Sequence, residues 1–193
     1  MKKLNTLLMI ALAATVFTAC HNNGTDSTAA ADSANKSKDT LSAKKDSTLV
    51  SMDDAKFAVD AANGGMTEIE LSKLAQSKTS NKQIKDFAGM MVMDHSKAGD
   101  QLKGIANLKH ITLPDSVSND SKQAITDMSK KSGADFDKAY VSKMVDDHTK
   151  VASMFETGSK NLRDTDLRNF AIKTLPTIKG HLAKIKAIQA GMK

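Results

Sequence analysis

Two matching histidine motifs are the parts of this sequence best suited to chemistry. They read Met91-Val92-Met93-Asp94-His95-Ser96-Lys97-Ala98 and Met144-Val145-Asp146-Asp147-His148-Thr149-Lys150-Val151. In each motif a methionine precedes the histidine by four residues, which places the two side chains on one face of a helix. That face also carries the apolar residues of each segment. We therefore expect both histidines to point into the interior of the protein.

Three further polar residues lie on or beside the apolar faces of other helical segments. His181 lies on the inward face of the last segment, and Glu68 on that of the first, with Glu70 close by. Imidazole binds zinc, copper, iron and nickel, and a thioether beside it favours Cu(I). The candidate metal ligands are therefore His95, His148, His181, Glu68, Glu70, Met91 and Met144.

The same residues support a second interpretation. Inward histidines and a glutamate can form a buried hydrogen-bonded or ion-paired network that fixes helix register, with the methionines as ordinary core filling. We favour this network, which makes the protein non-enzymatic, with a structural, stress-protective or binding role. The alternative is a metal-binding or metal-dependent redox domain, and a transition metal is the one cofactor that the residues suggest.

The scarcity of glutamate limits which metal site can be built. A ferritin-type di-iron centre takes a glutamate from each of two helices and a Glu-x-x-His motif from each of the other two. Glu68, Glu70 and Glu156 are the only glutamates, and Val92 and Val145 stand three residues before the motif histidines. A centre of this type is therefore excluded. The sequence also lacks Gly-x-Ser-x-Gly, Walker and dinucleotide-binding motifs, so we expect no catalytic residues.

Helices must position these side chains, because the apolar residues after Ser51 recur with a helical period. Two segments open with capping-box signatures, Ser51 with Asp54 and Ser80 with Gln83. The expected helices run over 52–76, from 80 to the segment 110–114, around 124–128 up to Gly133, over 134–160, and from Asp164 onward.

These elements predict an all-α fold, namely a ferritin-like four-helix bundle with a short extra helix in the long link between its two helix pairs. The link could cross the bundle or belong to an up-and-down arrangement. With a rise of about 1.5 Å per residue, the polar residues of all four helices come near mid-bundle in either topology. They are Glu68, His95, His148 and His181.

Residues 1–19 resemble a bacterial lipoprotein signal peptide. Lys2 and Lys3 precede a short apolar run from Leu7 to Phe17, and small residues lead to Cys20. The run is too short to remain as a membrane-spanning helix. The resemblance implies cleavage before Cys20 and lipid modification of that cysteine. Because His21 follows it instead of aspartate, the resemblance also implies an outer-membrane-anchored lipoprotein of the cell envelope, facing the periplasm or the surface.

Residues 20–50 should form a disordered tether between the lipidated cysteine and the bundle domain, 51–193. Large aliphatic residues are rare in this stretch, so it cannot bury enough apolar surface to offset its ordering entropy. The partner that we expect is therefore the membrane, through Cys20, and any protein partner is unknown.

Composition excludes other classes. A single cysteine rules out a disulfide framework and any multi-cysteine metal site. The formal charge of +6 falls once Lys2 and Lys3 are removed with the signal peptide, and the remaining lysines are scattered. This charge is too diffuse for a nucleic-acid-binding surface, so no nucleic-acid partner is expected.

Several strings resemble a bacterial envelope family called domain of unknown function 4142, whose members are often labelled outer membrane proteins. These strings are Gly64 to Ala75, Met91 to Lys97, Phe136 to Lys150 and Thr174 to His181. The resemblance covers about residues 51 to 190, and its most specific part is the paired Met-Val-x-Asp-His motif. It implies a helical bundle grouped with ferritin-like folds and an envelope location. It implies no activity.

Overall fold

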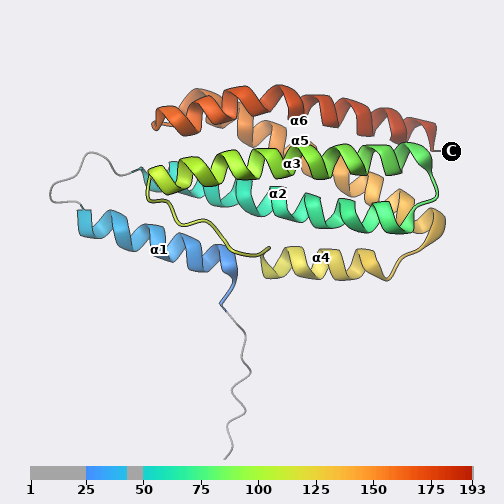
Figure 1. Ribbon diagram of the computed structural model, residues 1–193, viewed down its shortest axis with the longest axis horizontal. Coiled ribbons are helices and arrows are strands. Elements are labelled where there is room, and N and C mark those ends of the chain that lie inside the picture. Colours follow the sequence, from blue (N-terminus) through green and yellow to red (C-terminus); the bar gives the residue numbers. More distant parts are fainter. Residues whose placement is uncertain (1–24, 43–49, 193) are drawn as a thin grey trace, which may run out of the picture.

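The computed structural model describes residues 25–42 and 50–192 of the 193-residue chain, and these form six helices (Figure 1). The predicted signal peptide and Cys20 lie outside the described residues. The helices are α1 (Ser27–Ser42), α2 (Met52–Lys78), α3 (Lys82–Leu108), α4 (Asn119–Ser129), α5 (Gly133–Asn161) and α6 (Thr165–Gly191). None of the helices in this described part is long and apolar enough to cross a membrane.

Side-chain caps fix where the long helices begin. Ser51 caps α2 by accepting a hydrogen bond from the backbone N–H of Asp54, as its capping signature predicts. Asp164 caps α6 in the same way, through the N–H groups of Asp166 and Leu167. The predicted cap of α3 is wrong by one residue: Asn81, not Ser80, accepts hydrogen bonds from the first turn. Both residue types are good caps, so the sequence did not separate them.

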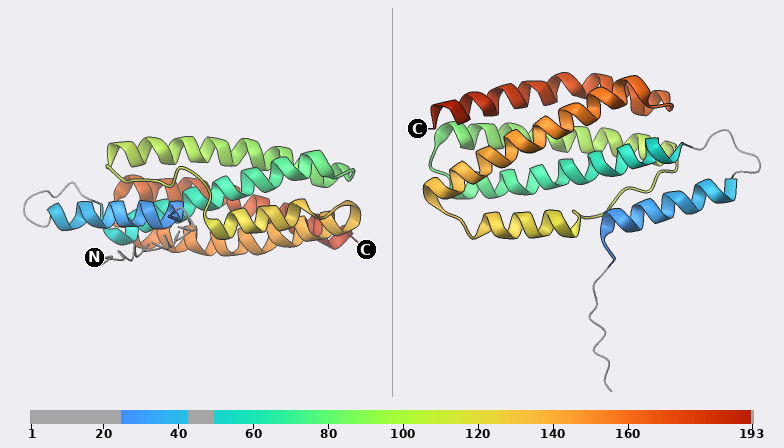
Figure 2. Two further views of the ribbon diagram at one scale, coloured as in Figure 1. Left: turned by 90° about the horizontal axis from the view of Figure 1, so that it is seen from below. Right: turned by 180° about the vertical axis from the view of Figure 1, so that it is seen from behind.

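The four long helices form two antiparallel pairs, α2 with α3 and α5 with α6, that pack against each other as a bundle (Figures 1 and 2). The link between the pairs runs back along the bundle and carries α4, so α3 and α5 point the same way. The long link is therefore a crossover, and the up-and-down alternative is wrong. The expectation of an all-α bundle with a short extra helix in its crossover is confirmed.

The core consists of two apolar clusters, one in each half of the bundle. One contains Phe57, Leu102, Phe155, Phe170 and Ile178, and the other contains Leu71, Phe87, Met91, Tyr140, Met144 and Ile185. On every long helix, the stretch between the two clusters carries a buried or half-buried histidine or glutamate: Glu68, His95, His148 or His181. A polar layer thus divides the core at mid-bundle.

The expected disorder of 20–50 is wrong for most of its described part, because α1 is a docked helix. It lies along α2, in line with α4 (Figure 1). Ala31 and Asn35 are buried, and Asn35 makes two hydrogen bonds with the backbone of Thr112 in the crossover. Lys38 donates to the carbonyl of His110, and Ser27 bonds with Asp115. Polar contacts with a distant loop, rather than an apolar stripe, hold this helix.

Candidate metal-binding site

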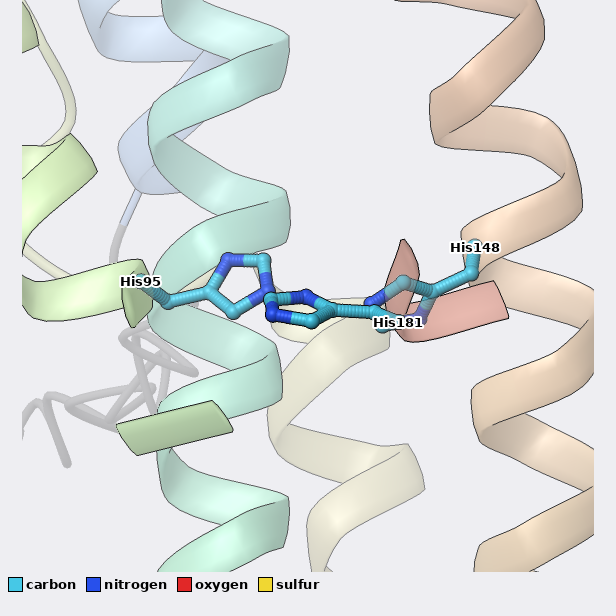
Figure 3. A group of neighbouring side chains, drawn as sticks. All are labelled: His95, His148 and His181. Carbon is cyan, nitrogen blue, oxygen red and sulfur yellow. The ribbon is translucent and has the colours of Figure 1, made fainter. Parts of the chain in front are cut away.

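The polar layer brings three imidazole rings together from three helices. His95 comes from α3, His148 from α5 and His181 from α6, and their rings face a common space between the helices (Figure 3). The ring centroids lie 5.4 to 5.8 Å apart. Each ring offers a nitrogen, and these three nitrogens lie within 4.8 Å of one another. The sequence prediction that these residues converge at mid-bundle is therefore confirmed.

Two of the rings are each oriented by a hydrogen bond from one of their two nitrogens. His181 donates from Nε2 to Oδ2 of Asp94 at 2.9 Å, and His148 donates from Nδ1 to the backbone carbonyl of Met144 at 2.9 Å. In a neutral imidazole, a nitrogen that donates leaves the other with a lone pair. These bonds therefore select tautomers that leave Nδ1 of His181 and Nε2 of His148 as acceptors.

Glu68 lies beside the rings of His95 and His148. Its Oε2 lies 3.3 Å from Nδ1 of His95, and its Oε1 lies 3.2 Å from Nδ1 of His148. The single proton on Nδ1 of His148 is directed at the Met144 carbonyl. Oε1 of Glu68 is consequently left without a hydrogen bond from any described residue, although it is fully buried.

One nitrogen of each ring is buried without a hydrogen-bond partner among the described residues. These atoms are Nε2 of His95, Nε2 of His148 and Nδ1 of His181. His148 is fully buried and His181 is 3% exposed. Leaving a buried polar atom unsatisfied costs about 1–3 kcal/mol, so these three atoms favour binding of a partner such as a water molecule or an ion.

Burial keeps two of these rings neutral. It lowers the pKa of His95 to about 3, with further lowering from the charges that His148 and His181 would carry. It lowers the pKa of His148 to about 4, again with a contribution from His181. Neutral imidazole is the form that binds metal ions. The same burial raises the pKa of Glu68 to about 8, helped by the negative charge of Asp147 and opposed by Lys143.

A cavity of about 620 Å³ reaches this layer from the side of α2, α3 and α6. Glu68, His95 and His181 line it, and so do Leu113 to Asp115 of the crossover. Three glycines within helices, Gly64, Gly65 and Gly99, also line it. No motif in the sequence predicts this cavity.

Three of the predicted ligands lie outside the imidazole group. Glu70 is exposed and pairs with Lys73 at 2.8 Å. It follows Glu68 by two residues on the same helix, so its side chain points away from the polar layer. Met91 and Met144 are fully buried in the apolar cluster around Leu71 and Phe87. Met144 contacts His148 through its backbone carbonyl, not its sulfur. Asp94 is not among the predicted site residues. Its hydrogen-bond partner His181 lies on another helix, so the spacing within one helix does not indicate the contact.

Comparisons with known proteins agree with this fold. A family model described as "Domain of unknown function (DUF4142)" matches residues 39–188. A crystal structure of a DUF305 fragment from Deinococcus radiodurans is similar to the bundle, with a TM-score of 0.66 and 9% sequence identity over 74% of this chain and 98% of that chain. At this identity the likeness supports the helical-bundle fold alone. No curated protein matches the chain.

Proposed function

We propose that this chain, which belongs to the family described as a domain of unknown function (DUF4142), binds one transition-metal ion through His95, His148 and His181. The observation that carries the proposal is the set of three buried ring nitrogens, one per ring, that lack any partner among the described residues. They belong to rings on three helices, and one nitrogen of each ring lies within 4.8 Å of one nitrogen of each of the others. A bound ion would satisfy all three at once.

The surroundings of the rings suit such an ion. Histidine ligands of metals commonly donate their second nitrogen to a carboxylate or a carbonyl, which fixes the tautomer and aims the ring. Asp94 and the Met144 carbonyl do this for His181 and His148, and Glu68 lies beside His95. Three protein ligands leave a fourth position of a tetrahedral ion open. His95 and His181 line the cavity, so a ligand in the cavity could reach that position.

The donor set favours zinc or copper(II) over the other candidates. Three imidazoles without thiolate suit these borderline ions, and Cu²⁺ has the highest affinity among the divalent first-row metals. Cu(I) would draw on thioethers, but the two methionines of the motifs lie in the apolar cluster. A ferritin-type di-iron centre remains excluded by the lack of carboxylates.

A structural role for the polar layer is the competing function, and the division of the core into two apolar clusters favours it. A polar layer in an apolar bundle can fix the register of its helices. However, a network that serves only this purpose should satisfy its own members. Here one atom of every ring, and Oε1 of Glu68, is left unsatisfied within the described structure.

Elemental analysis separates the two functions. The purified chain is incubated with Zn²⁺ or Cu²⁺, dialysed and analysed, beside the double variant His95→Ala with His148→Ala. We expect one ion per chain, lost in the double variant. The matched control is His110→Asn, because His110 lies in the crossover with φ of +56°, a backbone conformation that asparagine tolerates. If the wild type retains no metal while the double variant melts at a lower temperature, the layer is structural.

We also propose that Cys20 anchors the protein to a membrane of the cell envelope. The support is the sequence around it, with a basic start, a short apolar run and small residues before the cysteine. Cys20→Ser should move the protein from the membrane fraction to the soluble fraction, while His21→Ala should leave it in the membrane fraction. Membrane partitioning that persists in Cys20→Ser would remove the lipid anchor.

A further inference from the structure

We infer that the cavity of about 620 Å³ beside the imidazole layer binds a small organic molecule, neutral or cationic, whose nitrogen or oxygen donor takes the open position of the metal ion. The inference rests on the proposed metal site and names the kind of ligand that this site receives. The volume falls within the range of about 300–1,000 Å³ that is typical of small-molecule pockets. It is far larger than the passage of a single ion needs.

Glycines form part of the wall of the cavity. A Cβ added to Gly64 or to Gly99 would meet no described atom within 4 Å, and one added to Gly65 would meet only Nδ1 of His95, at 3.9 Å. No neighbouring helix therefore comes close enough to these positions to require glycine. Glycine within a helix costs about 1 kcal/mol relative to alanine. The open space is thus maintained at the expense of helix stability.

Three polar residues that line the cavity have buried atoms without hydrogen-bond partners among the described residues. Glu68 and His181 are both at least nine-tenths buried and line it, and each has one polar atom without a hydrogen bond from the described residues. With the unpartnered nitrogen of His95, these atoms mark the place at which a donor group would sit. A ligand that reached only the apolar part of the cavity would leave them unsatisfied.

The remaining wall selects the body and the charge of the ligand. Phe155, Phe170, Ile178 and Val151 supply an apolar surface, on which the two phenylalanine rings lie 5.8 Å apart. The cavity is also lined by the carboxylates of four aspartates, Asp60, Asp94, Asp100 and Asp115. Lys103 is the one cationic residue among the described residues that line it. The charge of the four aspartates exceeds that of Lys103 and a divalent ion together. This net negative charge disfavours an anion and tolerates a neutral or cationic molecule. The ligand therefore combines an apolar body with an uncharged or basic donor.

Three probes test this on the protein loaded with the metal that it retains after dialysis. They are 4-phenylimidazole, which has a donor and an apolar body, imidazole, which has the donor alone, and phenylacetate, which has a similar body and a negative charge. By isothermal titration calorimetry we expect 4-phenylimidazole to bind at least tenfold more tightly than the other two. Equal affinities for 4-phenylimidazole and imidazole would overturn the inference.

Filling the cavity provides the matched variants. Gly64→Leu and Gly99→Leu should weaken 4-phenylimidazole at least tenfold and leave imidazole binding and metal content unchanged. Gly104→Leu is the control, since Gly104 lies elsewhere on α3 and its added Cβ also meets no described atom. It should bind all three probes as the wild type does.

The outcomes keep the two proposals apart. If the wild type retains no metal, both the proposed metal site and this inference are wrong. If the wild type holds one metal ion and the two leucine variants bind 4-phenylimidazole as tightly as the wild type does, only this inference is wrong. If neither leucine variant folds, the space at both glycines is not open, and the inference is equally overturned.

Discussion

Glu68 links two helices of the polar layer to its own. Its carboxyl group lies within 3.3 Å of a ring nitrogen on α3 and on α5, and the side chain is almost completely buried. A group in this position can orient His95 as a metal ligand without coordinating the ion itself. The distinction can be tested, because a supporting residue should tune affinity where a ligand would abolish binding.

Glu68→Gln should lower metal affinity about 10- to 100-fold, the range for the loss of a partner that orients a histidine ligand. Competition with a chromogenic chelator measures the change. Glu70→Gln is the matched control, because Glu70 is exposed and pairs only with Lys73 among the partners found in the described structure. An equal loss in both variants would show that overall charge, and not the position of Glu68, sets the affinity.

The metal-free protein should be most stable near pH 6.5. The pKa values of His95 and His148 are lowered by burial to about 3 and about 4, so below pH 6.5 the unfolded chain takes up protons that the folded chain does not. Stability is therefore lost as the pH falls. The pKa of Glu68 is raised by burial to about 8, so above its ordinary value the unfolded chain releases a proton that the folded chain keeps. Stability is therefore also lost as the pH rises toward 8.

Urea midpoints measured at several pH values check this profile in the presence of a chelator. In Glu68→Gln the decline above pH 6.5 should disappear, because the amide does not titrate. A decline that persists in this variant would assign it to a different group.

At the residue scale, periodicity predicted which residues converge but not what each one does. The inward positions of the histidines and Glu68 follow from their spacing within apolar stripes. Met91 and Met144 share a face with His95 and His148, yet one helical turn moves them out of the layer and into an apolar cluster. Which ring atoms lack partners depends on side-chain geometry across three helices, and no spacing in the sequence encodes that.

At the scale of elements, α1 behaves differently from the bundle helices. It is joined to the crossover by side-chain hydrogen bonds from Ser27, Asn35 and Lys38, and the crossover segment 113–115 lines the cavity. The helix thus braces one wall of the cavity from outside. Its own buried surface is small, so its docking depends on a few polar contacts.

Asn35→Ala should loosen α1 without unfolding the bundle. The change removes both hydrogen bonds to Thr112 and leaves the backbone N–H and carbonyl of that residue unsatisfied. We expect faster amide hydrogen exchange in 27–42 and in the crossover 110–116, with unchanged protection in α2, α3, α5 and α6. Ser33→Ala, at an exposed position of the same helix, should change neither. Uniformly faster exchange throughout the bundle would show that α1 is part of the cooperative core.

The difference between α1 and the other helices also explains what the sequence could predict of the fold. The four long helices carry continuous apolar stripes, and two of their caps, Ser51 and Asp164, are correct. The segment of α1 is rich in serine, alanine, aspartate and lysine and resembles a linker. Its order comes from contacts with residues more than seventy positions away, such as Thr112, which composition does not reveal.

At the scale of the whole molecule, a metal ion that binds only the folded chain should raise the melting temperature. The gain in free energy of unfolding follows RT ln(1 + [L]/Kd), about 4 kcal/mol when the free ion exceeds Kd a thousandfold. Melting followed by circular dichroism should therefore shift upward with Zn²⁺ or Cu²⁺ and return on adding EDTA. The shift should be absent in the double variant of His95 and His148. An equal shift in that variant would indicate binding elsewhere.

The crossover has a consequence for how such a site could ever form. His95 belongs to the first helix pair, while His148 and His181 belong to the second, and the whole length of the link and α4 separates them. Neither pair alone contains more than two of the three rings. A partly assembled chain, with only one hairpin in place, therefore offers no complete set of donors. The ion would be captured only after the two halves have docked, so occupancy of the site would report that folding is finished.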